Sequence, residues 1–302
     1  MKHLVKSGFV VFVVILLGTS AHAFSLGTAG DYSAFIFGNF GATSSDVEGR
    51  LAAGGNVNIK NYSIGAALPS NSGNVLVSGG KLTLNSGYIH SGNTVVGGKA
   101  SLINAGHDGT VTSKALVPID FSAEETYLDN LSASLKGLTP TGTVAYNNGE
   151  IDLTGDGTKN LQVFNIKGSE LSSAWGLFNS VKNLNNARLI LNISGTSDKM
   201  MSMDFNLGDS ANNVLLNFYD ATRLDLGAIG ISGSILAPHA DVYANNGHLD
   251  GTIIAESWNG GMQINNYLFN DVFPPAPVPE PSTFLLFAAG LGGFALWRRK
   301  RS

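Results

Sequence analysis

The chain has 302 residues, no cysteine, 38 glycines and a charged fraction of only 13%. Without cysteine it can form no disulfide, thiolate metal site or cysteine nucleophile, and its length accommodates one large domain or two small ones. The glycine content, together with many Asn, Ser and Thr residues, is typical of an all-β protein rich in turns.

The first 23 residues have the pattern of a secretory signal peptide. A basic start precedes an apolar stretch from Phe9 to Leu17, and Ala21 and Ala23 supply the small residues of a cleavage site. We therefore expect the mature protein to begin at Phe24 and to be exported by the secretory pathway. An uncleaved N-terminal membrane helix is the alternative, which the shortness of the apolar stretch disfavours.

The net charge changes when the signal peptide and the basic tail 298–302 are removed. The precursor carries −4, but the remaining residues hold 12 basic against 22 acidic side chains, a net charge of −10. An acidic surface argues against nucleic acid and anionic membrane as partners of the mature protein. Carboxylates on this surface could bind divalent cations such as Ca²⁺.

Glycine-rich repeats predict the architecture of the central part of the chain. Gly54-Gly55, Gly79-Gly80 and Gly97-Gly98 each precede a short strand of alternating apolar residues, at spacings of 25 and 18 residues. The pattern recurs at Gly233 and Gly251, again 18 residues apart. Repeats too short to bury their own apolar faces are typical of stacked coils. We expect an all-β, right-handed β-solenoid (β-helix), with a β-sandwich as the alternative.

One amphipathic helix is predicted after the first group of repeats. Ser122 and Glu125 form a capping box, and Gly137 with Pro140 marks the end of the helix. Four leucines at 3–4–3 spacing form a single apolar stripe: Leu128, Leu131, Leu135 and Leu138. Two heptads are too few for a coiled coil, so we expect this helix to pack along the flank of the solenoid.

The topology of residues 141–225 is left open by the sequence. Strands are predicted at Leu161–Ile166, Ala187–Ile193, Met201–Leu207 and Val214–Phe218. Between them, Ser169–Leu184 forms either a short helix or a packed loop.

Two groups of acidic residues are candidates for a metal site. Asp46, Glu48 and Arg50 alternate along an extended segment and so point to one side. The two carboxylates could bind Ca²⁺, but we favour a structural ion pair through Arg50 that seals the first coil. Asp152 and Asp156 alternate with glycine as in a calcium-binding turn, without the final glutamate of an EF-hand, and a hairpin turn is preferred. Beyond these Ca²⁺ candidates we predict no cofactor.

Residues with catalytic potential occur near the C-terminal repeats. Asp241, Asp250 and Glu256 could serve a glycan-active β-helix enzyme, either a polysaccharide lyase or a hydrolase. Three aromatic residues could stack on sugar rings, namely Tyr243, Tyr267 and Trp258, although burial under the terminal coil is preferred for Trp258. The chain lacks a nucleophile elbow, a P-loop and an H-E-x-x-H pair, and its histidines show no helical ligand spacing: His90, His107, His239 and His248. We predict that the protein is not an enzyme.

Several segments of the predicted domain, residues 24–272, resemble the choice-of-anchor A family. They are Ser45–Val57, Asn217–Thr222, Gly233–Pro238, Gly251–Ala255 and Ile264–Tyr267. The resemblance implies a secreted, surface-displayed domain with an adhesive or matrix role and no established reaction. A looser relation to ice-binding β-solenoids supports the fold. Ice binding itself would require a flat Thr-x-Thr face, and the chain has this pattern only at Thr110–Thr112 and Thr141–Thr143, the latter preceded by the overlapping Thr139–Thr141.

The C-terminus contains three consecutive segments. A proline-rich linker, residues 273–283, includes the sequence Val278, Pro279, Glu280, Pro281 and Ser282. A hydrophobic run without charge follows, with Phe284, Leu285, Leu286, Phe287, Leu291, Phe294, Leu296 and Trp297. The tail, Arg298, Arg299, Lys300 and Arg301, would act as a cytoplasmic stop. As a helix, the run would be roughly 21 Å long against a hydrocarbon core of about 30 Å, a marginal membrane anchor.

This three-part order resembles the PEP-CTERM sorting signal of Gram-negative bacteria, with an ordinary membrane anchor as the alternative. The resemblance implies processing by an exosortase-type enzyme after transient anchoring of a transmembrane helix in the inner membrane. The mature protein would then reach the cell surface or extracellular matrix. Taken together, the sequence predicts a non-enzymatic surface or matrix protein with a role in adhesion or biofilm. Its expected partners are extracellular polysaccharide or other surface components.

Overall fold

The computed structural model describes residues 24–158, 161–205 and 211–269, which are mostly β. The predicted signal peptide, Pro-Glu-Pro motif, hydrophobic run and basic tail all lie outside the described residues. Among the residues that are described, no helix is both long and apolar enough to cross a membrane.

The N-terminal stack, residues 34–113, consists of coils that each combine a long strand with a short one. The long strands are β2 (Phe40–Val47), β4 (Val57–Ile64), β6 (Leu82–Ile89) and β8 (Ala100–His107). The short strands are β1 (Ala34–Ile36), β3 (Leu51–Ala53), β5 (Asn74–Ser78), β7 (Asn93–Val96) and β9 (Val111–Ser113). Each long strand bends at one residue with a positive φ of 49° to 60°: Ser44, Asn61, Ser86 and Asn104. Asn and Ser are short enough to tolerate this conformation, and the bend gives every coil three sides.

The C-terminal stack, residues 143–265, continues the same construction with less regular coils. Its strands are β10 (Thr143–Asn147), β11 (Glu150–Thr154), β12 (Leu161–Lys167), β13 (Gly176–Lys182), β14 (Arg188–Ser194), β15 (Ser197–Met201), β16 (Asp204–Phe205), β17 (Val214–Phe218), β18 (Arg223–Ser232), β19 (Ser234–Asp250), β20 (Ile253–Gly260) and β21 (Gln263–Asn265). Short helices are η1 (Gly27–Asp31), α2 (Gly168–Leu171) and η2 (Ala211–Asn213).

Three of the four strands predicted in this region agree with β12, β14 and β17. The fourth differs from the structure. The strand expected at Met201–Leu207 is confirmed only as the short strand β16, because β15 ends at Met201 and Ser202 takes a φ of 53° that turns the chain; Leu207 lies outside the described residues. The segment Ser169–Leu184 contains most of helix α2, as one of the two expected alternatives, and also strand β13, which was not predicted.

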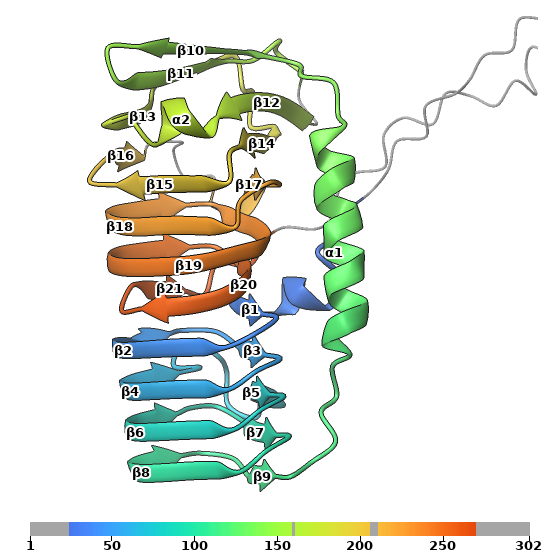
Figure 1. Cartoon of the computed structure of the whole chain (residues 1–302), viewed down its shortest axis with the longest axis vertical. Helices are drawn as coiled ribbons and strands as arrows, with labels where there is room; N and C mark the ends of the chain where they lie inside the picture. The colour runs from blue at the N-terminus through green and yellow to red at the C-terminus, as the bar shows by residue number, and fades with distance from the viewer. Residues whose placement is uncertain (1–23, 159–160, 206–210, 270–302) are drawn as a thin grey trace, which may run out of the picture. The chain divides into compact units, whose positions relative to one another are not determined.

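The coils do not follow one another along the stack in simple chain order (Figure 1). The N-terminal stack starts at β1 and proceeds to β8 and β9, and helix α1 (Phe121–Lys136) then returns past the coils. The C-terminal stack begins at the far end with the hairpin β10–β11 and comes back coil by coil. Its last strands pair in parallel with the first strands of the domain: Ala34 with Ile253, and Phe40 with Trp258. We call this junction the seam.

Three walls result from this stacking. The covered wall contains β1, β3, β5, β7, β9, β12, β14, β17 and the first residues of β19 and β20. The first open wall comprises residues 197–201, 223–227, 241–245, 257–260, 40–43, 57–60, 82–85 and 100–103. The second open wall comprises residues 229–232, 248–250, 263–265, 45–47, 62–64, 87–89 and 105–107.

Helix α1 packs on the covered wall, as the leucine stripe predicts. Leu128, Leu131 and Leu135 are buried in a cluster with outward residues of that wall, such as Phe35 and Leu215. Under the helix the covered wall is therefore buried on both sides, which explains why all five residues of β17 are buried, whereas those of β9 are partly or largely exposed. The helix starts earlier than the capping box predicts: Asp120, not Ser122, is the N-cap, and its carboxylate accepts a hydrogen bond from the backbone of Ala123 (3.1 Å).

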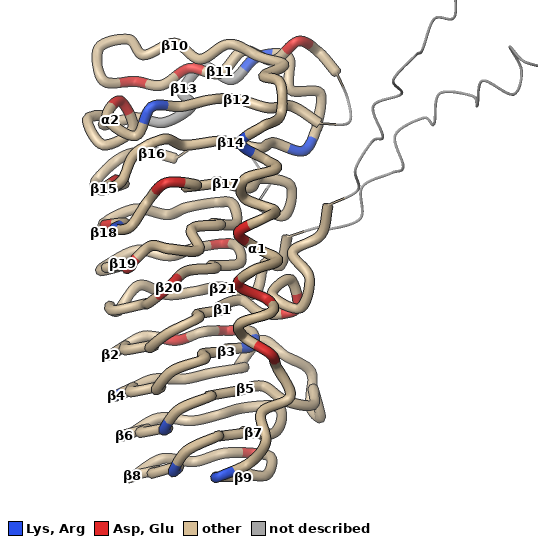
Figure 2. The backbone as a smooth tube through the Cα atoms, turned by 45° about the vertical axis from the view of Figure 1, so that its right-hand side comes forward, with Lys and Arg blue, Asp and Glu red and all other residues tan. Residues whose placement is uncertain are grey.

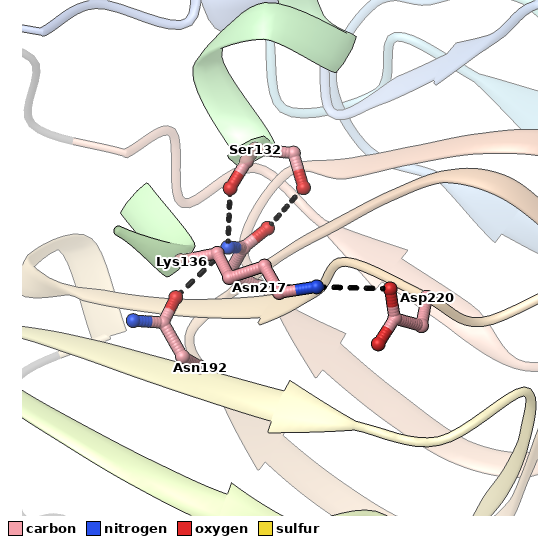
Figure 3. A network of polar contacts seen from close by, with 5 residues as sticks. All are labelled: Ser132, Lys136, Asn192, Asn217 and Asp220. Carbon is pink, nitrogen blue, oxygen red and sulfur yellow. Dashed lines mark hydrogen bonds and ion pairs between the residues drawn. The ribbon is translucent and has the colours of Figure 1, made fainter. Parts of the chain in front are cut away.

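A buried polar network fixes the helix on the wall (Figure 3). The Asn217 amide donates to the carbonyl of Ser132 (3.0 Å) and to Oδ1 of Asn192 (2.8 Å), and it accepts from the Ser132 hydroxyl (2.6 Å). Asn192 in turn donates to the carbonyl of Leu135 (2.8 Å). Because two neighbouring coils each supply one asparagine to the same helix, these contacts fix the position of α1 along the stack.

Candidate functional site

Asp46 lies on the second open wall and Glu48 follows directly after this wall, but Arg50 forms no ion pair with either of them. The Arg50 guanidinium donates to the carbonyl of Ser72 (3.0 Å) and belongs to none of the salt bridges between described residues. The predicted ion pair is therefore wrong: Arg50 fastens a loop. Glu48 accepts a hydrogen bond from the backbone of Asn266 (3.1 Å), which ties the first coil to the last. Burial, and then the charge of Glu48, raise the pKa of Asp46.

The second pair of metal candidates also has local structural roles. Asp156 accepts a hydrogen bond from the backbone of Thr158 (2.9 Å), and this bond lowers the pKa of Asp156. Asp152 lies in the hairpin β10–β11, opposite Ala145, and its Oδ2 is 3.4 Å from the amide of Asn147. Asp156 therefore lies in a local turn as preferred, but this turn does not close a hairpin, because β11 pairs with β10 and β13 and not with β12, and Asp152 lies within a strand. Within the described ranges, no group of three His, Asp or Glu residues is arranged to hold a metal ion.

The candidates for a glycan-active enzyme are not gathered into one groove. Asp241 is on the first open wall, where it accepts a hydrogen bond from Ser257, and Asp250 is on the second, bound to Asn265 (2.6 Å). Glu256 lies at the corner beside Gly38. Burial raises the pKa of Glu256, as do the charges of Glu125 and Asp241, against the opposing effect of His239. Three pockets of about 230, 350 and 220 Å³ contain none of these three carboxylates.

The aromatic candidates divide between the interior and the surface. Trp258 is 1% exposed and stacks on Phe40, with ring centroids 6.1 Å apart and an interplanar angle of 5°. Its burial was expected, but its place is the seam in the middle of the stack and not a terminal coil. Tyr243 is partly exposed on the first open wall beneath the guanidinium of Arg223 (4.2 Å), and Tyr267 is exposed.

The histidines are in separate local contacts. His239 Nε2 lies 3.3 Å from a carboxylate oxygen of Asp129 on α1, and His248 Nε2 lies 3.8 Å from Asp250. The ring of His90 packs on Tyr88 with centroids 4.5 Å apart, and His107 bonds to the carbonyl of Gly109 (2.6 Å). This separation agrees with the lack of ligand spacing in the sequence.

One ionisable residue was not singled out from the sequence. Asp198 is 2% exposed and pairs in register with the core residue Leu224, so its side chain points into the coil. Burial raises its pKa to about 6. In Ser197–Met201 exposed and buried positions alternate, and Asp198 shares the buried side of the strand with Met200.

The described domain is thus a parallel β-solenoid. Helix α1 packs on its covered wall, and the first and second open walls remain extended and largely polar. Residues 25–266 match the family of the putative ice-binding-like adhesive domain, and the chain belongs to this family. Residues 277–300 match the PEP-CTERM protein-sorting motif, in agreement with the predicted signal. The family match does not address the resemblance to choice-of-anchor A, which stays a prediction.

Two solved structures were found to be similar. One is an ice-binding protein from the Antarctic ascomycete Antarctomyces psychrotrophicus, with 12% identity and a TM-score of 0.37, covering 82% of this chain and 98% of that chain. The other is an ice-binding protein from an Antarctic biological consortium, also with 12% identity and a TM-score of 0.37, covering 84% of this chain and 94% of that chain. At this level of similarity they carry no argument about function. A search of curated proteins gave no match.

Proposed function

We propose that this chain is a non-enzymatic adhesive protein of the cell surface or extracellular matrix, exported and then processed at the Pro-Glu-Pro motif. The observation that carries the proposal is the order of the two matches. An adhesive-type domain at 25–266 is followed directly by a sorting motif at 277–300. An exosortase-type enzyme is the partner that such a motif implies.

The shape of the domain supports binding of a large surface component more than turnover of a small substrate. Two walls of parallel strands remain open along the coils, and the acidic residues that a glycan-active enzyme would require lie on different walls. The Thr-x-Thr stretches do not stack on neighbouring coils either, because Thr112 is on β9 and Thr143 begins β10. Adhesion or biofilm association through extracellular polysaccharide is therefore our preferred role, ahead of glycan cleavage and ice binding.

Three finer predictions belong to this proposal. We propose that the solenoid is right-handed, that the domain is of the choice-of-anchor A type, and that the run from Phe284 to Trp297 is a transient membrane helix. The signal peptide would be removed after Ala23.

The test is deletion of residues 278–302 in the producing bacterium, followed by cell fractionation and an aggregation assay. A matched variant, Glu280→Ala, changes the motif and leaves the hydrophobic run intact. We expect both variants to be lost from the surface fraction and the cells to aggregate less. Surface display and aggregation at the wild-type level in both variants would refute the proposal.

A further inference from the structure

The net charge of the protein conceals two regions of opposite sign. Residues 50–118 contain five basic residues and a single acidic one, Asp108, whereas residues 119–269 contain 16 acidic and seven basic residues. Figure 2 shows basic positions at β6, β8 and β9, at the end of the N-terminal stack, and further ones at the opposite end of the molecule, where acidic positions accompany them. The argument from net charge against polyanionic partners therefore does not apply to this end of the molecule.

Three lysines occupy the same corner of successive coils. Lys81 and Lys99 directly precede the register partners Leu82 and Ala100, and the backbone of Lys114 donates to the carbonyl of Gly98 (2.8 Å) in the neighbouring coil. All three side chains are exposed, as is Lys60 on the adjoining wall. Neighbouring coils are about 4.8 Å apart, and the salt bridges between described residues include none of these lysines. Like charges therefore face each other without a counter-charge.

The lysines replace residues that would have stabilised the corner. In the preceding coils, Asn39 accepts a hydrogen bond from the backbone of Asn56 (2.8 Å), and Asn56 accepts one from the backbone of Lys81 (2.8 Å). A lysine has no acceptor, so this ladder of side-chain bonds ends where the lysines begin. The exchange removes these side-chain hydrogen bonds and adds positive charge, which favours a role in binding an anionic ligand.

The wall beside this corner offers neutral hydrogen-bonding groups and no acid. Along the first open wall, Gly41, Asn58, Thr83 and Ser101 form one column, and Thr43, Lys60, Asn85 and Ile103 form the next. Amide and hydroxyl groups can pair with sugar hydroxyls, and lysines can pair with carboxylates. Neither column contains an aromatic ring on which a nucleic-acid base could stack.

We propose that the first open wall of the N-terminal stack, with its lysine corner, binds an acidic polysaccharide whose uronate groups lie against Lys60, Lys81, Lys99 and Lys114. This inference rests on the proposed adhesive function and names the chemistry of its ligand. The polymer would lie across successive coils, one carboxylate meeting each lysine.

Binding of the exported protein to immobilised polygalacturonate tests the proposal, with neutral dextran as the comparison polymer. The informative variant is Lys60→Gln/Lys81→Gln. Lys99 and Lys114 stay unchanged, because they are on the terminal coil, where lysines also prevent strand pairing between molecules. The control is Lys199→Gln, an exposed lysine of the same wall in the C-terminal stack, next to Asp225 in register.

We expect selective binding to polygalacturonate, weakened about five-fold per lysine removed, and weakened further as salt rises from 50 to ~300 mM. The control should bind like the wild type. Equal binding to dextran, equal binding to single-stranded DNA, or an unaffected double variant would each overturn the proposal. Surface display of the double variant should be normal. A failure of the polysaccharide-binding proposal can therefore be distinguished from a failure of the sorting proposal, in which surface display itself would not depend on the Pro-Glu-Pro motif.

Discussion

The strongest structural prediction concerns Asn217, which joins helix α1 to the covered wall. Its side chain is 0% exposed and makes three hydrogen bonds, two with Ser132 and one with Asn192. In Asn217→Ala, these bonds are lost and the buried Ser132 hydroxyl and Asn192 carbonyl oxygen lose partners. Neutral hydrogen bonds contribute a net ~1 kcal/mol each to stability. The loss of these bonds therefore predicts a total loss of about 3 kcal/mol.

Thermal and urea unfolding of the exported protein measure this loss. For a domain of this size, about 3 kcal/mol lowers the Tm by about 6–12 °C. The matched control is Lys136→Gln on the same helix, which removes the ion pair with Asp220 (3.3 Å) between half-exposed side chains (50% and 46%). Such pairs contribute at most about 1 kcal/mol. If Asn217→Ala costs no more than the control, the network does not hold the helix and our reasoning is wrong.

Two further substitutions test the interior. Burial raises the pKa of Asp198 from its usual value of 3.8 to about 6, so the folded state favours the protonated acid. The stability of the fold therefore falls as the pH rises from about 4 to about 6. Asp198→Asn should therefore stabilise the protein by about 2–3 kcal/mol at pH 7.5 and have little effect at pH 4; equal effects at both pH values would contradict the burial argument. Trp258→Ala should cost about 3–5 kcal/mol in urea unfolding, because it leaves a cavity beside Phe40 at the seam. A loss below about 1 kcal/mol would show that the first and last coils do not depend on this contact.

Features with a local signal were predictable from the sequence. The glycine corners before Val57, Leu82 and Ala100 mark the starts of β4, β6 and β8, and the leucine stripe gives the buried face of α1. Each arises from the spacing of residues within one coil or one helix.

Features that depend on distant contacts were not predictable in this way. The pairing of Ala34 with Ile253 joins segments more than two hundred residues apart, and no periodicity in either strand identifies the other as its neighbour. For the same reason the sequence placed Trp258 under a terminal coil. The side chain of Asp198 points inward because it lies in the short alternating strand β15 (Ser197–Met201), whereas the residue pattern predicted a strand only from Met201 onward. The sequence did contain a signal for the lysine corner, because residues 50–118 hold five basic residues and only one acidic residue. The negative net charge of the whole chain does not reveal this local excess of positive charge.

The central claim is that the domain is delivered to the cell exterior by its C-terminal signal. The most direct measurement is the intact mass of the protein isolated from the cell surface or culture medium, with its C-terminal residue assigned. Our account predicts a chain that begins at Phe24 and ends at or near Glu280, without the segment from Phe284 to Ser302. Recovery of the full chain, Met1 to Ser302, from the cytosolic fraction would contradict it.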